Sequence, residues 1–213
     1  MTTVPKWTIL IATLGQRRTK FEHLMMELLP QVDKVNGLVT VHAFWNNGER
    51  PLSYVRQDLL ESAESEYVSF VDDDDGIPDY FVSKVLPLLD GVDYIGWMMQ
   101  CYASSVKLNP TEHSLKHNRW WSDSVGYYRD LSHLNPIKRE IALLVNYKNT
   151  SPPEDASWVE QMRGKVNTEH FIDDIMYYYY STSDSTWRGG DSINRQQTFQ
   201  RANINNSNFK WIE

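Results

Sequence analysis

The sequence predicts an α/β fold in which helices connect the strands of a parallel central sheet. Strand-like and helix-like segments alternate through roughly the first hundred residues, which is the pattern of βαβ units. An acidic run directly follows one of the predicted strands, at the edge where open α/β sheets bind their ligands. The 213 residues are enough for one domain, or a tight pair, with a full hydrophobic core.

Four segments of the first half are typical of buried strands, because they are short, rich in apolar and β-branched residues and bounded by turn signals. We expect these strands at residues 7–13, 37–45, 67–71 and 93–100. Helices are expected between them, at residues 17–32, at 51–63 and from Pro78 onward. In the first helix the apolar residues recur at helical spacing and form one face: Phe21, Leu24, Met25, Leu28, Leu29 and Val32. This order predicts parallel strands joined by right-handed crossovers.

The second half of the chain is less regular. It contains an aromatic stretch at 120–128 and a segment of uncertain type at 137–145, followed by a short helix through Trp158 and Met162. Residues 171–180 fit either a helix or a strand. The polar segment at 181–213 contains Gly189 and Gly190, so we expect it to be flexible.

The composition excludes several classes of protein. Lys and Arg number 21 against 28 Asp and Glu, a net charge of −7, which disfavours a generally basic nucleic-acid binder. No apolar run approaches the ~20 residues of a membrane span, so we expect no integral membrane segment. Cys101 is the only cysteine, which excludes a disulfide within the chain and fits a reducing compartment. We therefore expect a cytoplasmic protein.

The acidic run Asp72–Asp75 follows the third predicted strand. Four adjacent carboxylates repel one another unless a cation compensates them, and carboxylate oxygens suit Mg²⁺ or Mn²⁺ bridged to phosphate. A solvated loop is the competing interpretation. An EF-hand loop is excluded, because placing Gly76 at its sixth position puts valines at its first and twelfth positions, where ligands are required.

Three motifs, at residues 9–13, 66–75 and 153–158, resemble motifs that follow one another in the same order in family 2 glycosyltransferases, which have the GT-A fold. Residues 66–75, Glu-Tyr-Val-Ser-Phe-Val-Asp-Asp-Asp-Asp, are similar to the strand of that family that ends in its Asp-x-Asp motif. Residues 9–13 resemble its first strand, and residues 153–158, Pro-Glu-Asp-Ala-Ser-Trp, resemble its Glu-Asp-x-x-Trp element. The resemblance implies one GT-A domain over residues 1–213. It would have a Rossmann-like nucleotide-sugar-binding half at about 1–105 and a fused acceptor-side half at about 106–180, sharing a mixed central sheet.

The resemblance also implies roles for the acidic run. The Asp-x-Asp motif holds Mn²⁺ or Mg²⁺ on the diphosphate of a nucleotide sugar, which makes Asp74 the expected direct ligand. Asp72 is expected at the metal or the ribose, and Asp73 beside the nucleotide. His170 is an expected third metal ligand, because some GT-A enzymes use a late histidine, although a lone histidine is also a common packing or surface residue.

A general base for an inverting displacement is implied at Asp155, with Glu154 as the second candidate. Such a carboxylate takes the proton of an acceptor hydroxyl as that hydroxyl attacks the anomeric carbon. Both residues also follow Pro152 and Pro153, where carboxylates favour the start of a helix. The two roles are compatible.

Nucleotide contacts are implied at three further positions. Thr13 ends the first strand, where the base would lie. Asn46 replaces the aspartate that many family members place after the second strand, which puts a preference for uracil in question. Arg56 matches a basic position on the next helix, although an ordinary exposed arginine fits equally well. Trp187 and Arg188 are expected to close over the diphosphate unless the tail is unanchored.

The implied function is a metal-dependent inverting glycosyltransferase that uses a nucleotide-diphosphate sugar donor. Its hydroxyl acceptor is a glycan, a protein or a hydroxymethylated DNA base, since the chain resembles small bacterial or phage transferases. A nucleotidyltransferase-like enzyme would use similar aspartates on a metal. A non-catalytic carbohydrate-binding module would explain the 8 Trp and 12 Tyr without needing the acidic run.

Overall fold

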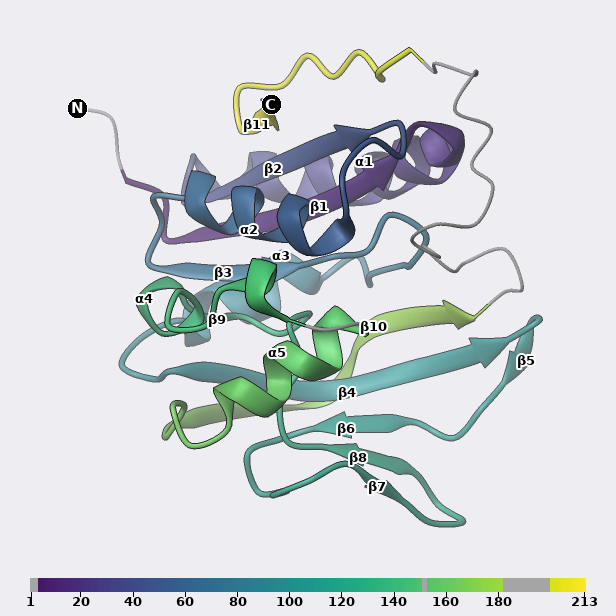
Figure 1. Cartoon of the computed structure of the whole chain (residues 1–213), viewed down its shortest axis with the longest axis vertical. Coiled ribbons are helices and arrows are strands. Elements are labelled where there is room, and N and C mark those ends of the chain that lie inside the picture. Colours follow the sequence, from purple (N-terminus) through teal and green to yellow (C-terminus); the bar gives the residue numbers. More distant parts are fainter. Residues whose placement is uncertain (1–3, 151–152, 182–199) are drawn as a thin grey trace.

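A mixed β-sheet runs through the chain and has helices on both faces (Figure 1). The computed structural model describes residues 4–150, 153–181 and 200–213. Within these residues nine strands follow the order β11-β2-β1-β3-β9-β4-β6-β8-β7, and β10 and β5 also pair with β4. The strands are β1 (Trp7–Leu14), β2 (Val39–Asn46), β3 (Tyr67–Phe70), β4 (Tyr94–Ala103), β5 (Val106–Lys107), β6 (Thr111–His113), β7 (Trp121–Ser122), β8 (Tyr127–Arg129), β9 (Ile137–Lys138), β10 (Glu169–Ser181) and β11 (Phe209–Ile212).

Helices cover the sheet because successive strand residues point to opposite faces. In β1, Ile9 and Ile11 belong to one buried apolar cluster, whereas Leu10 and Ala12 belong to a second. The first cluster includes residues of α1 (Arg18–Val32) and α3 (Phe81–Val85), and the second includes residues of α2 (Leu52–Ser62), α4 (Arg139–Ala142) and α5 (Glu154–Met162). In Figure 1, α2, α4 and α5 lie in front of the sheet and α1 lies behind it.

Parallel pairing brings the loops that carry the site to one edge of the sheet. Strand β1 pairs in parallel with both β2 and β3, and Leu14 at its end lies opposite Asn46. The loop after β1 and the acidic loop after β3 therefore leave the sheet on the same side.

The other half of the sheet is mixed. The short strand β9 lies between β3 and β4 and is antiparallel to both, pairing Tyr67 with Lys138 and Tyr94 with Ile137. The long strand β10 runs parallel to β4, and an isolated bridge joins its Tyr178 to Gly76. This bridge places the end of β10 beside the acidic loop.

The structure confirms the alternating first half and resolves the uncertain segments. Residues 171–180 lie in a strand, and residues 137–145 begin as β9 and continue into α4. The expected flexible segment at 181–213 is wrong for its last residues, because β11 pairs with β2. Aromatic packing explains this pairing, since the rings of Phe209 and Trp211 lie 6.3 and 5.3 Å from that of Phe21. In the described residues no helix is both long and apolar enough to cross a membrane.

Candidate active site

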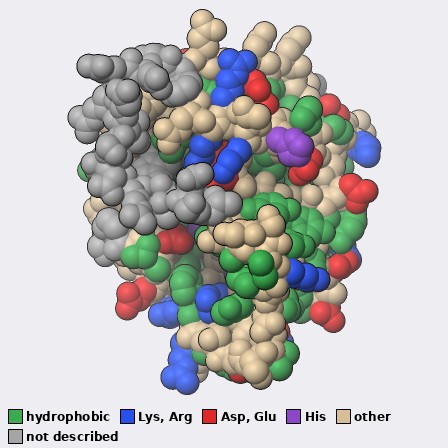
Figure 2. Space-filling model, turned by 90° about the vertical axis from the view of Figure 1, so that its right-hand side faces the viewer, with side chains coloured by type: hydrophobic (Ala, Val, Ile, Leu, Met, Phe, Trp, Pro, Cys, Tyr) green, Lys and Arg blue, Asp and Glu red, His purple; other side chains and the backbone are tan. Residues whose placement is uncertain are grey.

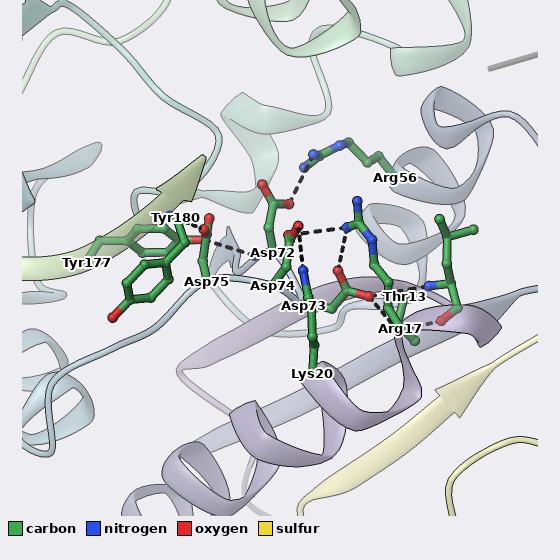
Figure 3. Close-up of polar contacts among 11 residues, drawn as sticks. Thr13, Arg17, Lys20, Arg56, Asp72, Asp73, Asp74, Asp75, Tyr177 and Tyr180 are labelled. Atoms are coloured by element: carbon green, nitrogen blue, oxygen red, sulfur yellow. Dashed lines mark hydrogen bonds and ion pairs between the residues drawn. The ribbon is translucent and has the colours of Figure 1, made fainter. Parts of the chain in front are cut away.

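The four carboxylates of the acidic loop point to different partners (Figure 3). Asp72 is directed to Arg56 of α2, and Asp73 to the end of β1. Asp75 is directed to tyrosines of β10, and Asp74 to Arg17 and Lys20. The loop is therefore held from three sides.

Asp73 anchors the loop to β1. Its buried carboxylate accepts hydrogen bonds from Thr13 Oγ1 (2.7 Å) and from Arg17 Nη1 (2.8 Å). Burial raises the pKa of Asp73, and the charge of Arg17 opposes that shift. Thr13 is fully buried, and its hydroxyl is bonded to Asp73. Thr13 and Asp73 therefore hold the acidic loop against the end of β1.

Asp75 ties the same loop to β10. The Tyr177 hydroxyl donates to Asp75 Oδ2 (2.9 Å), and the backbone N–H of Tyr180 donates to Oδ1 (2.9 Å). The Tyr177 oxygen also accepts the backbone N–H of Asp72 (3.0 Å). Burial raises the pKa of Asp75 well above its usual range, and the charge of Asp72 adds to the shift.

Asp74 is the carboxylate best placed to receive a cation. Its Oδ1 lies 3.2 Å from Arg17 Nη1, whereas Oδ2 is buried without a hydrogen-bond partner, with Lys20 Nζ 4.0 Å away. Burial raises the pKa of Asp74 to about 6, because the charged form is poorly solvated there. An unpartnered buried carboxylate oxygen fits a divalent cation.

Arg56 links the acidic loop to the start of α5. Its guanidinium is buried, with Nη2 3.2 Å from Asp72 Oδ1 and Nε 3.3 Å from Glu154 Oε1. It also lies over the ring of Phe70, 5.0 Å from the centroid. Burial acts to lower the pKa of Arg56, but the two carboxylates outweigh it and raise the pKa above its usual value. The sequence left open an ordinary exposed arginine, and the structure excludes that interpretation.

The two carboxylates that begin α5 have different surroundings. Glu154 is paired with Arg56. Between described residues, the carboxylate of Asp155 accepts one hydrogen bond, from the backbone N–H of Ala156 (2.8 Å). Both follow Pro153, in the first turn of the helix, where a carboxylate is favoured.

Two cavities meet at these residues. The first, which we call the arginine cavity, has a volume of about 320 Å³ and is lined by Arg17, Arg56, Asp72–Asp74, Glu154 and neighbouring residues. The second, the aromatic cavity, measures about 420 Å³ and includes Trp120, Tyr127, Arg129 and His133 in its wall. Asp72, Asp155 and Tyr179 line both cavities.

A third cavity of about 770 Å³ lies between α1 and the acidic loop and shares Asp73, Asp74 and Tyr180 with the arginine cavity. Figure 2 shows the side to which β4 and β10 point in Figure 1. Basic and acidic side chains lie together in the upper half of that face, and hydrophobic side chains gather below them.

The structure does not bring every expected site residue together. Asn46 is fully buried and closes its own loop, since Oδ1 accepts the backbone N–H groups of Gly48, Glu49 and Arg50 and Nδ2 donates to the Arg50 carbonyl. His170 pairs with Ile95 at the start of β10, whereas Tyr180 pairs with Tyr102 near its end. Because the register of β10 shifts between Ile172 and Tyr177, the distance is better measured along β4. Ile95 and Tyr102 are seven residues apart, which places His170 roughly 23 Å from Tyr180.

The expected third ligand is therefore wrong by geometry, and the described residues contain no group of three His, Cys, Asp or Glu that could hold a metal ion. Trp187 and Arg188 lie outside the described residues.

Three residues of the site had no assigned role in the sequence. Arg17 follows β1 in the segment Gly-Gln-Arg-Arg, which is only a weak match to the glycine-rich basic loops that bind phosphate. Tyr177 lies in a run of four tyrosines with nothing to distinguish it. His133 is buried with its Nε2 unpartnered, and burial lowers its pKa well below the usual range, with Arg56 adding to the shift. Only the fold brings these three residues to the acidic loop.

Comparison with known proteins gives a fold but no family. No protein-family model matches the chain, and no curated protein matches its sequence. Three solved structures of S. aureus TarS, each of residues 1–349, are similar in fold. The first has a TM-score of 0.59 at 17% identity, over 82% of this chain and 60% of that one.

The TarS complex with UDP has a TM-score of 0.58 at 16% identity, over 83% of this chain and 61% of that one. The complex with UDP-GlcNAc has a TM-score of 0.53 at 14% identity, over 83% and 59%. The chain therefore spans about 60% of the length of these structures. The likeness, together with the mixed sheet, shows that this chain has a GT-A-like glycosyltransferase fold.

Proposed function

We propose that this chain is a metal-dependent inverting glycosyltransferase, related to family 2, which moves a sugar from a nucleotide-diphosphate donor to a hydroxyl acceptor. The main support is the meeting of the acidic loop, Arg56 and Asp155 in the wall of one cavity. That wall contains arginines that can bind phosphate and carboxylates that can bind a metal. It also contains the carboxylate of Asp155, which can accept the proton of the acceptor hydroxyl.

The donor diphosphate binds in the arginine cavity. Guanidinium groups suit phosphate oxygens, and Arg17 and Arg56 both line this space. TarS has been solved with UDP and with UDP-GlcNAc, which supports a nucleotide-sugar donor for this chain also.

Asp74 and Asp72 hold the metal. Asp74 offers a buried oxygen without a hydrogen-bond partner, and the side chain of Asp72 is 30% exposed. Magnesium commonly binds through one or two carboxylates and completes its shell with water and substrate phosphates, so two protein ligands suffice. When bound, Mg²⁺ or Mn²⁺ supplies neutralisation of the charge that builds on the leaving diphosphate.

Asp155 acts as the general base. It lines both cavities, so an acceptor in the aromatic cavity and a donor in the arginine cavity meet beside it. The carboxylate takes the acceptor proton, the acceptor oxygen bonds to the anomeric carbon, and the bond from that carbon to the diphosphate breaks. Glu154 is engaged by Arg56 and holds that arginine in position.

A thermal-shift panel of nucleotide sugars, each with Mn²⁺, Mg²⁺ or EDTA, tests the proposal. We expect one nucleotide sugar to raise the melting temperature with a metal and not with EDTA. Stabilisation by nucleoside triphosphates alone would instead favour a nucleotidyltransferase. Stabilisation by glycans with no response to any nucleotide would favour a carbohydrate-binding module.

A further inference from the structure

The aromatic cavity contains an arginine, Arg129, that has no acidic partner in the part of the chain that the structure describes. Arg129 ends β8 and pairs in register with His113 of β6. Among the described residues no carboxylate forms an ion pair with its guanidinium. The next residue, Asp130, is already paired with Arg163, at 2.5 Å between Oδ2 and Nε.

The guanidinium of Arg129 is held in a fixed orientation. Its Nη1 donates to the backbone carbonyls of Trp121 (3.2 Å) and Tyr128 (2.9 Å). It also lies 4.8 Å from the ring centroid of Trp120 and 6.0 Å from that of Tyr127. Its Nε and Nη2 form no hydrogen bond with any described residue, so one edge of the group is ready to donate. Burial lowers the pKa of Arg129, which shows that its charge is poorly solvated.

The charges of this cavity are unevenly distributed. Arg129 is the one Lys or Arg in the wall formed by the described residues, and Asp72 and Asp155 are the carboxylates. Strand β8 lies four positions from β3 in the sheet order, roughly 19 Å at ~4.8 Å per strand. Since Asp72 follows β3, the guanidinium of Arg129 lies on a different wall of the cavity from Asp72. His113 adds no charge near neutral pH, because burial lowers its pKa to about 4.

We propose that the aromatic cavity binds an acceptor sugar that carries a phosphate or carboxylate group, with the anion on Arg129 and the sugar ring against Trp120. Trp120 is 39% exposed at the cavity, and an aromatic face suits the apolar face of a sugar ring. A nucleic acid would present a phosphate at every nucleotide, for which one cation is too few. This inference rests on the proposed function, in which the aromatic cavity is the acceptor side.

Binding of simple sugars tests the inference without a known acceptor. Glucose, glucose 6-phosphate and glucuronic acid are titrated into ¹⁵N-labelled protein through the millimolar range, and amide and indole NMR shifts are followed. UDP and Mg²⁺ are present to fill the arginine cavity. We expect both anionic sugars to bind about tenfold more tightly than glucose, the effect of one charge-assisted hydrogen-bonded contact. Comparing glucose 6-phosphate with glucuronic acid shows whether the cavity prefers a phosphate or a carboxylate.

Variants localise the effect. Arg129→Gln should remove the preference for anionic sugars, Arg129→Lys should keep part of it, and Arg119→Gln, at an exposed arginine of the same region, should keep all of it. Equal binding of all three sugars, no binding of any, or a preference that survives Arg129→Gln would overturn the inference. Donor binding in the thermal-shift panel is a separate result. The proposed function stands if only the anion preference fails, and it fails if no nucleotide binds while Arg129 still selects anionic sugars.

Discussion

Arg17 and Asp73 form a buried ion pair, with 2.8 Å between Nη1 and Oδ1 and side-chain exposures of 11% and 1%. The same Nη1 lies 3.2 Å from Asp74 Oδ1. One guanidinium therefore compensates two adjacent carboxylates and stabilises an acidic loop that would otherwise repel itself. The pair connects the start of α1 to the loop after β3.

Arg17→Met should destabilise the fold strongly. The substitution leaves Asp73 charged and buried, and breaking a buried pair on one side costs about 3–5 kcal/mol. Urea unfolding would measure the loss. Arg18→Met is the matched control, because Arg18 is 44% exposed and pairs only with the surface residue Glu22 among described carboxylates. Equal losses in both variants would show that Arg17 does not stabilise the loop in this way.

Asp155→Asn should abolish transfer while leaving donor binding intact. The amide keeps the size of the side chain but cannot accept the acceptor proton, and general-base catalysis contributes about 10²–10⁴-fold in rate. The measurement pairs a transfer assay with a thermal shift by the donor. Glu160→Gln, at an exposed position of the same helix, should change neither. Normal transfer by Asp155→Asn would mean that another group takes the proton.

Asp74→Asn should remove the metal-dependent stabilisation by the donor and stabilise the metal-free protein. The folded pKa of Asp74, about 6, lies above its usual 3.8, so the unfolded chain ionises first. Wild-type stability therefore declines as pH rises from about 4 to about 6, and the variant escapes this loss of about 3 kcal/mol. Urea unfolding with EDTA across that range measures it, with Asp79→Asn, at an exposed position, as control. A variant less stable than wild type above pH 6 would contradict this account.

His113 should make the fold sensitive to acid. Its Nδ1 lies 2.7 Å from Asn135 Oδ1, and burial lowers its pKa from 6.5 to about 4. Between these values the unfolded chain binds more protons, so stability is lost as pH falls from 6.5 to 4, by roughly 3 kcal/mol. In His113→Gln the slope of stability against pH should flatten over this range, whereas His23→Gln, at an exposed position, should leave it unchanged. An unaltered slope in His113→Gln would assign the sensitivity to other groups.

Local pattern predicted the first half of the fold well, because each element there is decided by neighbouring residues. The spacing of Phe21, Leu24 and Leu28 predicts α1 without reference to the rest of the chain. Strand β11 could not be predicted in this way. Its Phe209 and Trp211 become a strand only because they pack against α1, far away in sequence.

The candidate site was predictable where the type of side chain and its position in the fold point to the same place. A run of carboxylates after a strand indicates a ligand site, and the structure places Asp72, Arg56 and Asp155 in one cavity wall. The individual partners were not predictable, since they depend on register. Thr13 and Asp73 face each other because β1 and β3 pair in parallel, and Tyr177 reaches Asp75 because β10 bridges the loop at Gly76.

The wall that the two cavities share has a consequence for affinity. Because Asp72 and Asp155 belong to both spaces, a ligand in one cavity alters the charge and hydration that the other presents. Thermodynamic linkage makes this effect reciprocal: whatever factor the first ligand contributes to the second, the second contributes to the first. A dissociation constant measured with one cavity empty therefore describes a different receptor from the one present when both are filled.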